Sequence, residues 1–226
     1  MQALEPAPQE TGAATTALVY ASGTPAPATL ILGHGAGAGQ HHPFMVEFAH
    51  GLSALGLDVV TFNFLYTEQK RRIPDRAPLL EACYRAVIDA VRDNLDSATR
   101  TLFIGGKSMG GRISTQVAAA DAQLPVAGLV LLGYPLHPPA QPQKLRDAHL
   151  PLVGRPMLFI QGSRDAFGTP DELAPILGRL TPLPVVHTVA GGDHSFKVGK
   201  KDPARQAEIH AEIQRTIASW VRAGGT

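Results

Sequence analysis

Two kinds of apolar segment alternate along the chain. The first kind is a short apolar run, which is typical of a buried strand in a parallel sheet. Runs of this kind lie at residues 17–20, 28–32, 57–64, 101–104, 126–132, 156–160 and 185–189. The second kind has the apolar spacing of a helix and lies at residues 42–55, 78–95, 112–120, 170–180 and 202–222. This alternation predicts an α/β fold, with a mostly parallel, doubly wound sheet and helices on both faces.

Several segment ends carry start and stop signals. Gly56 ends the first helical segment, Thr169 and Asp202 stand at N-cap positions, and Pro203 takes the first helical position of the last helix. The run at residues 17–20 is short, and we expect it to be an edge strand. The helix at 78–95 is expected to place five residues near one face: Leu79, Leu80, Cys83, Val87 and Val91.

The domain is predicted to span residues 17–226, after a flexible leader of residues 1–16. The leader mixes Ala, Pro, Gln, Glu and Thr and lacks the basic and apolar regions of a secretory signal. The chain has 226 residues, of which 44% are hydrophobic, and this is enough for one substantial core. No apolar run approaches the length of a membrane span, so we expect no membrane association.

Charge and cysteine content narrow the classes of partner. Nineteen acidic and twenty basic residues give a net charge of +1, so no long-range field favours nucleic acid or an anionic membrane. The single cysteine, Cys83, excludes an internal disulfide, and we expect it to be a small buried apolar side chain. These features predict a cytoplasmic protein.

The segment Gly106-Lys107-Ser108-Met109-Gly110-Gly111 lies between a predicted strand and a predicted helix. A G-x-S-x-G segment at such a turn is the form of a nucleophile elbow, in which the serine is held exposed at the edge of the sheet. A phosphate-binding P-loop would require a glycine five residues before Gly106, where this chain has Thr101. The pattern therefore favours Ser108 as an attacking hydroxyl.

A serine nucleophile needs a base and an acid that orients the base. In α/β-hydrolases these follow the serine in the order acid, then histidine. Asp165 lies just after the strand at 156–160, and His194 lies in the loop before the last helix. The rival acids are Asp171, which begins a helix, and Asp193, which is adjacent to His194 and so points elsewhere in most conformations. We predict Ser108, Asp165 and His194 as the catalytic residues.

An acyl-transfer site also needs backbone donors for the developing oxyanion. The first is the amide after the nucleophile, Met109, and the second comes from the loop after an early strand. That loop is the glycine-rich segment 33–39, where we select Ala36 and keep Gly37 as the alternative. The same segment does not satisfy the G-x-G-x-x-G pattern of dinucleotide binding, because Gln40 occupies the last glycine position.

Four segments, in this order, resemble the small α/β-hydrolases related to dienelactone hydrolases. They are Gly33-His34-Gly35-Ala36-Gly37, Gly106-Lys107-Ser108-Met109-Gly110-Gly111, Gln161-Gly162-Ser163-Arg164-Asp165 and Gly191-Gly192-Asp193-His194-Ser195-Phe196. Residues 62–66, with Arg71, Arg72, Pro74 and Asp75, are similar too. The resemblance implies a single-domain α/β-hydrolase fold. Dienelactone hydrolases proper use a cysteine nucleophile where this chain has Ser108, and eukaryotic relatives include a subunit of a histone-acetyltransferase complex.

The connection between the strands at 126–132 and 156–160 is short and rich in proline, so it predicts no large cap over the site. A basic group, Lys70 to Arg72 with Arg76, either faces an anionic substrate or forms a solvated loop paired with Glu68 and Asp75. Lys107 either biases the elbow towards negative charge or pairs with a neighbouring acid.

The predicted function is a serine hydrolase that acts on a small carboxylic ester through an acyl-enzyme, with thioester or lactone hydrolysis as related outcomes. The alternative is a non-catalytic interaction module on the same fold. No cofactor is expected, and adjacent His41 and His42 do not have the i, i+4 spacing of a helical metal site. The sequence does not predict the substrate-binding residues or the oligomeric state.

Overall fold

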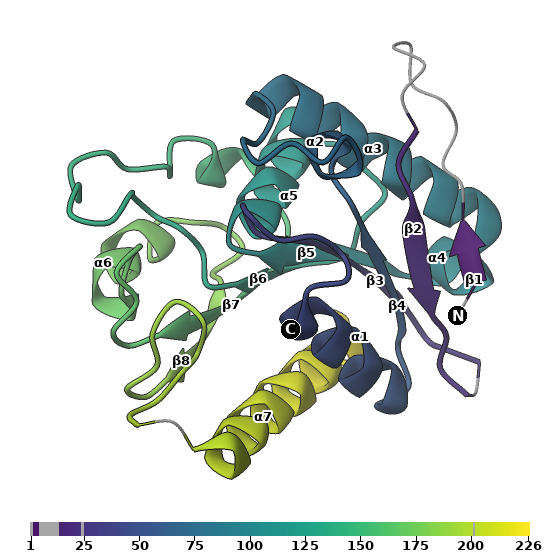
Figure 1. The fold of residues 1–226 in the computed structure, drawn as a ribbon. Coiled ribbons are helices and arrows are strands. Elements are labelled where there is room, and N and C mark those ends of the chain that lie inside the picture. The colour runs from purple at the N-terminus through teal and green to yellow at the C-terminus, as the bar shows by residue number, and fades with distance from the viewer. Residues whose placement is uncertain (1, 5–13, 24, 201) are drawn as a thin grey trace.

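Strands from eight segments form one sheet through the middle of the molecule, and helices cover both faces (Figure 1). The computed structural model describes residues 2–4, 14–23, 25–200 and 202–226. The strands are β1 (Gln2–Leu4), β2 (Ala17–Tyr20), β3 (Thr29–Gly33), β4 (Asp58–Phe62), β5 (Leu102–Lys107), β6 (Gly128–Leu132), β7 (Met157–Gly162) and β8 (Val185–Val189). Their order is β1-β2-β4-β3-β5-β6-β7-β8. The pairs β1–β2 and β2–β4 are antiparallel and the remaining pairs are parallel.

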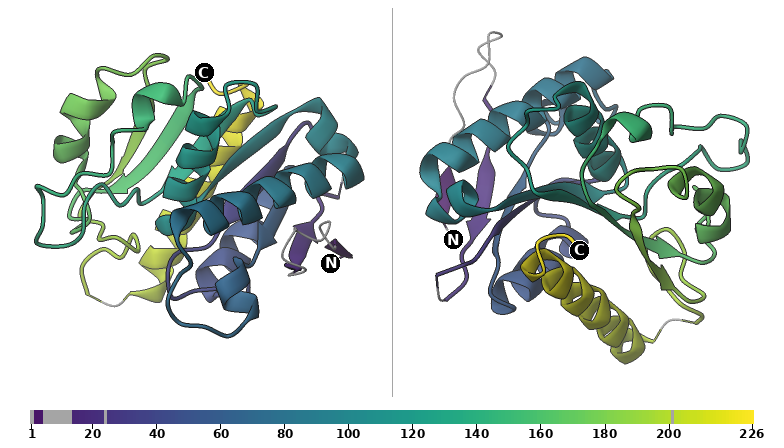
Figure 2. Two further views of the ribbon diagram at one scale, coloured as in Figure 1. Left: turned by 90° about the horizontal axis from the view of Figure 1, so that it is seen from above. Right: turned by 180° about the vertical axis from the view of Figure 1, so that it is seen from behind.

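The helices divide between the two faces of the sheet. They are α1 (Pro43–Ala54), α2 (Leu65–Glu68), α3 (Ala77–Asn94), α4 (Asp96–Arg100), α5 (Met109–Ala120), α6 (Pro170–Leu177) and α7 (Pro203–Arg222), with a 3-10 turn at Leu150–Leu152. Helices α1 and α7 pack together on one face, whereas α3, α5 and α6 share a core with the other face (Figure 2). The predicted doubly wound α/β architecture is therefore confirmed.

The structure has a strand or a helix at every segment that the hydrophobic pattern predicted, with ends displaced by a few residues. Strands β3, β6 and β7, each predicted from an apolar run, are buried at every position. The Thr169 hydroxyl accepts from the amide of Glu172, and Asp202 accepts from the amide of Arg205 at 3.1 Å. Both predicted N-caps are thus confirmed, and each satisfies an amide that has no partner within its helix.

Two local predictions are wrong. Leu79 was expected near one face of α3 together with Leu80 and Cys83, which are buried, but Leu79 lies in the first turn of the helix and is 44% exposed. Strand β2 was expected at the edge of the sheet, but β1 pairs with it on its outer side.

The predicted flexible leader, residues 1–16, also needs correction at both ends. Gln2–Leu4 form β1, which takes up the open edge of β2. Thr15 is buried and its hydroxyl donates to the carbonyl of Asn63, while the amide of Thr16 donates to Glu68 at 2.9 Å. The remaining part, residues 5–13, lies outside the described residues. Residues before position 17 therefore already contribute to the sheet and pack against the domain.

The loops at the carboxyl ends of the parallel strands gather at one edge of the sheet, the usual position of ligand sites in such folds (Figure 2). The connection from β6 to β7 has no regular structure beyond the 3-10 turn, so it forms no helical cap. Among the described residues, no helix has both the length and the apolar character needed to cross a bilayer.

Candidate active site

Ser108 lies in a sharp turn between β5 and α5. Its backbone has φ 50° and ψ −111°, a combination that side chains rarely adopt and that is found at nucleophile elbows. The turn is tight because the chain passes directly over β3. A Cβ at Gly106 would lie 2.2 Å from the carbonyl oxygen of Gly33, and one at Gly110 would lie 2.1 Å from it. The two glycines are therefore required for the turn, as the motif predicted.

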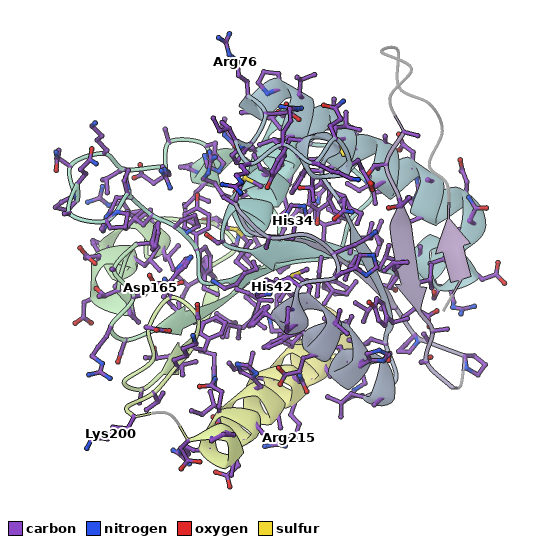
Figure 3. All side chains as sticks on the ribbon, in the orientation of Figure 1. His34, His42, Arg76, Asp165, Lys200 and Arg215 are labelled. Carbon is purple, nitrogen blue, oxygen red and sulfur yellow. The ribbon has the colours of Figure 1, made fainter. Side chains whose placement is uncertain are left out.

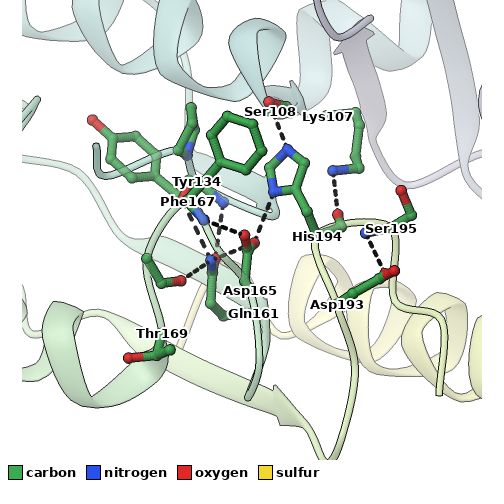
Figure 4. Close-up of polar contacts among 12 residues, drawn as sticks. Lys107, Ser108, Tyr134, Gln161, Asp165, Phe167, Thr169, Asp193, His194 and Ser195 are labelled. Atoms are coloured by element: carbon green, nitrogen blue, oxygen red, sulfur yellow. Dashed lines mark hydrogen bonds and ion pairs between the residues drawn. The ribbon is translucent and has the colours of Figure 1, made fainter. Parts of the chain in front are cut away.

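The three predicted side chains meet in one chain of hydrogen bonds (Figure 4). The Oγ of Ser108 is 2.9 Å from Nε2 of His194, and Nδ1 of His194 is 2.8 Å from Oδ2 of Asp165. A carboxylate only accepts, so Nδ1 carries the ring proton and Nε2 is left to accept from the serine hydroxyl. This is the arrangement in which an imidazole can withdraw the proton of a serine.

Asp165 is fully buried and receives further donors. Its Oδ2 accepts from Nε2 of Gln161 at 2.9 Å, and its Oδ1 accepts from the amide of Phe167 at 2.8 Å. The same Gln161 amide group donates to the carbonyl of Gly168, and its Oε1 accepts from the amide of Tyr134. Gln161 therefore fixes the carboxylate to two loops. Sequence reasoning did not identify this role, although a polar residue that continues the apolar strand at 156–160 was a signal for it.

The rival acids point away from His194. Asp193 accepts at Oδ1 from the amides of Ser195 and Lys197, at 2.7 and 2.9 Å, and so closes its own turn. Asp171 is exposed in the first turn of α6. Of the three candidate acids, Asp165 is the one that contacts the imidazole. The ring of Phe167 covers that imidazole, with centroids 4.2 Å apart.

Lys107 lies at the elbow in the wall of the cavity, and its close contact is with the loop that carries His194. Its Nζ donates to the backbone carbonyl of His194 at 2.6 Å and lies 5.4 Å from the centre of the Phe196 ring. No carboxylate of the described residues forms an ion pair with it. Burial lowers the pKa of Lys107 to about 8. The residue before the serine thus holds the loop that carries His194.

The loop at residues 33–39 runs beside Ser108. A Cβ at Gly35 would be 3.6 Å from the Cβ of Ser108. The His34 ring (labelled in Figure 3) fixes this loop, because its Nε2 accepts from the amide of Phe64 and its Nδ1 donates to the carbonyl of Gly35 at 2.8 Å. Burial lowers the pKa of His34 to about 4, so the ring stays neutral and keeps one donor and one acceptor.

The candidate oxyanion donors lie on both sides of the serine. Met109 is the first residue of α5, and an amide at that position has no acceptor within the helix. Ala36 lines the same cavity as Ser108, whereas the backbone of Gly37 lies beside the hydroxyl of Tyr66. Of the two alternatives in the loop, Ala36 is therefore the one that lines the cavity.

The basic group at residues 70–76 does not face the site. Lys70, Arg71, Arg72 and Arg76 are exposed, and Arg76 points away from the molecule (Figure 3). Arg71 pairs with Asp75 at 2.6 Å, which agrees with the solvated-loop interpretation. Glu68, the other expected partner, instead accepts from Thr15, Thr16 and Asn63.

A cavity of about 750 Å³ opens at Ser108. The elbow contributes Lys107, Ser108 and Met109, and Ala36 and His194 complete the wall next to the hydroxyl. Cys83 lies away from it, buried, with a pKa that burial raises to about 12, as expected of a packed thiol. Among the described side chains, no three His, Cys, Asp or Glu residues are grouped to hold a metal ion.

Known proteins share this architecture. A serine hydrolase without a lid from Xanthomonas campestris is 24% identical over 97% of this chain and 94% of its own, with a TM-score of 0.71. A dienelactone hydrolase from Anabaena variabilis is 19% identical, with 98% and 96% covered and a TM-score of 0.76. Est1E from Butyrivibrio proteoclasticus is 13% identical, with 98% of each chain covered and a TM-score of 0.73. At these identities the likeness is one of fold.

The family follows from a match at the level of sequence. A family model described as an alpha/beta hydrolase domain matches residues 26–222, which is the greater part of the chain. The match includes the elbow and the loops that carry Asp165 and His194. This chain therefore belongs to the alpha/beta hydrolase family.

Proposed function

We propose that this protein is a serine hydrolase that cleaves small carboxylic esters through an acyl-enzyme. The observation that carries the proposal is the continuous hydrogen-bonded chain from Ser108 through His194 to the buried Asp165, opening on a cavity. Membership of the alpha/beta hydrolase family supports it, as do the serine hydrolase and the dienelactone hydrolase among the structural neighbours.

In the proposed acylation, the Oγ of Ser108 attacks the ester carbonyl carbon while Nε2 of His194 takes the hydroxyl proton. The carbonyl oxygen becomes an oxyanion, which accepts from the amides of Met109 and Ala36. Loss of one such donor typically costs about 2.7–4 kcal/mol of transition-state stabilisation. When the carbon–oxygen bond breaks, the imidazolium returns its proton to the departing alkoxide, and the acyl group stays on Ser108.

Deacylation repeats these steps with water. His194 takes a proton from a water molecule, the hydroxide attacks the acyl carbonyl, and the acid is released as the proton returns to Ser108. Asp165 stabilises the imidazolium in both halves, since its carboxylate remains charged next to Nδ1. The Lys107 contact and the Phe167 ring keep the imidazole in position between the two partners.

The cavity also supports the proposed size class of substrate. Its volume of about 750 Å³ suits a small molecule, and the connection between β6 and β7 leaves it without a cap that would enclose a long lipid chain. A thioester or a lactone has the same electrophilic carbonyl, so both fit the same steps. The alternative of a non-catalytic interaction module gives no reason for the buried, fully bonded acid behind His194.

The proposal is tested with short-chain p-nitrophenyl esters and a fluorophosphonate probe. We expect turnover by the natural chain and covalent labelling of Ser108, and a fall in kcat of about 10⁴-fold or more in Ser108→Ala. Ser219→Ala, an exposed serine on α7, is the matched control and should retain both. Equal turnover by the two variants, or a folded protein whose Ser108 is not labelled, would contradict the proposal and favour the interaction module.

A further inference from the structure

Two arginines line the cavity from different elements. Arg112 belongs to α5 and Arg146 to the connection between β6 and β7, and both are half-buried in the cavity wall. Arg112 lies one helical turn beyond the serine, since its amide donates to the carbonyl of Ser108 at 3.0 Å. Arg112 and Ser108 therefore lie one turn apart at the start of the same helix, and both line the cavity.

The backbone of Arg146 is held in place although the segment around it has little regular structure. Its carbonyl accepts from the hydroxyl of buried Tyr134 at 2.6 Å, and its amide donates to the carbonyl of Leu136 at 2.8 Å. The connection thus presents this guanidinium to the cavity from a fixed position, which is what a binding residue requires.

Neither guanidinium has a carboxylate partner among the described residues. Arg112 donates to Oε1 of Gln116 at 3.3 Å, and Arg146 donates to the carbonyl of Pro135 at 3.5 Å. Each arginine has five N–H donors, so most of them are free for a ligand. Burial and the nearby charge of Arg146 lower the pKa of Arg112, so the charge of Arg112 lacks compensation in the cavity wall. An anion between them would provide that compensation.

The other charges of the wall leave the cavity positive. Lys107 and Lys197 add two more cations, and the two carboxylates of the wall are Glu47 and Asp75. Both carboxylates already have partners, because Glu47 bonds to His210 at 2.8 Å and Asp75 pairs with Arg71 at 2.6 Å. They therefore compete little for Arg112 and Arg146.

We propose that Arg112 and Arg146 bind a carboxylate of the substrate, so that the esters hydrolysed best carry a negative charge a few bonds from the scissile carbonyl. A planar guanidinium matches a carboxylate with two parallel hydrogen bonds, which gives orientation as well as affinity. This inference rests on the proposed hydrolase function, since it names the substrate class of the same site.

The test compares two pairs of esters, and in each pair one ester carries a free carboxylate and the other carries the methyl ester of that carboxylate. In the first pair, mono-p-nitrophenyl glutarate is compared with its methyl-capped derivative, so the charge lies on the acyl part. In the second pair, 4-carboxyphenyl butyrate is compared with its methyl ester, so the charge lies on the alcohol part. In at least one pair, kcat/KM of the charged ester should exceed that of the neutral one by about tenfold or more, with the excess shrinking as salt rises. A ratio of one or less in both pairs would overturn the inference.

Variants assign the preference to the two residues. Arg112→Gln and Arg146→Gln should each lower the ratio, mainly by raising KM for the charged ester, whereas Arg215→Gln, exposed on α7 (Figure 3), should keep it. Unchanged ratios in both cavity variants would also overturn the inference. If these variants do not fold, competitive inhibition of the natural chain provides the test: monomethyl glutarate, which keeps one carboxylate, should inhibit more strongly than the neutral dimethyl ester, and equal inhibition would contradict the inference. Failure of the proposed function looks different, because no ester would then be hydrolysed and the phosphonate would not label Ser108.

Discussion

Two histidines that line the same cavity, His194 and His210, each pair with a carboxylate, and the two pairs differ in what surrounds them. Nδ1 of His194 is 2.8 Å from Asp165, and Nδ1 of His210 is 2.8 Å from Glu47. In the first pair the other ring nitrogen meets the hydroxyl of Ser108; in the second it meets the amide group of Gln206, also at 2.8 Å. An amide nitrogen donor offers no nucleophile, so the second pair cannot perform the proposed chemistry.

The two acids differ as clearly as the two partners. The side chain of Asp165 is 0% exposed and accepts from Gln161 and the amide of Phe167 as well as from the ring. The side chain of Glu47 is 46% exposed and has His210 as its hydrogen-bonded partner. A short histidine–carboxylate distance is therefore not sufficient for the proposed chemistry. The pair also needs a buried acid that is fixed by other donors, and a hydroxyl within hydrogen-bond distance of the second ring nitrogen.

The largest expected difference between the two pairs is in kcat, when the carboxylate of each pair is replaced by an amide. Asp165→Asn should lower kcat by about 10³- to 10⁴-fold, because the amide no longer stabilises an imidazolium or holds the required tautomer. Glu47→Gln should change kcat by less than about threefold, since the Glu47 carboxylate is 46% exposed and its pair lies outside the proposed proton path. Steady-state ester hydrolysis, with circular dichroism to verify folding, measures both. Similar losses in the two variants would mean that the pairs do not differ as the geometry indicates.

Local pattern was sufficient to predict one pair and could not have revealed the other. Ser108, Asp165 and His194 each follow the end of a strand, and short apolar runs mark the strands clearly. The G-x-S-x-G turn and the order of acid and histidine therefore predict all three residues from the sequence. His210 and Glu47 lie on two amphipathic helices, and their contact depends on how α1 packs against α7. Side-chain pairs of this kind arise from tertiary packing, which single-sequence periodicity does not encode.

The same limit explains the missed supports of the site. Lys107 bonds to a carbonyl 87 residues further along the chain, and Gln161 connects Asp165 to a loop after a different strand. Leu79 shows the same limit for the fold. Helical spacing places it near the apolar face of α3 but does not say whether the first turn of the helix is covered, and Leu79 is exposed. Elements and their order were predictable; the contacts between them were not.

A second, smaller effect should follow when the loop of His194 loses its anchor. Lys107→Met removes the donor to the His194 carbonyl while keeping the length of the side chain, and we expect kcat to fall about tenfold with little change in KM, since the imidazole is displaced and not removed. Lys107→Arg should not restore activity. The Nζ of Lys107 packs so closely against Gly133 that a Cβ added there would lie 2.9 Å from it, and a guanidinium is bulkier than an ammonium group. Lys200→Met, an exposed lysine (Figure 3), is the control.

Stability distinguishes this positioning role from a merely structural one. The pKa of Lys107 is lowered to about 8, below its usual value of 10.5, so between these pH values the unfolded chain binds more protons than the folded one. The stability of the natural chain should therefore rise with pH across that window, and the rise should be absent in Lys107→Met. At pH 7 the variant should unfold no more easily than the natural chain although it is less active. Loss of activity and stability together would contradict a positioning role.

The smallest effect concerns His149, which forms no ion pair with an acid among the described residues, in contrast to both pairs. Nε2 of His149 is 2.8 Å from the hydroxyl of Thr115, and burial together with the charge of Arg112 lowers the pKa of His149 to about 4. Between pH 6.5 and 4 the unfolded state therefore binds more protons, so this contribution is complete above pH 6.5 and is lost as the pH falls. His149→Gln, which can still bond to Thr115, should reduce the loss of unfolding free energy between pH 7 and pH 5 by roughly 1 kcal/mol, after allowance for partial exposure. Urea unfolding at the two pH values measures it, and equal losses in both proteins would show that the imidazole of His149 is protonated without cost in the folded state.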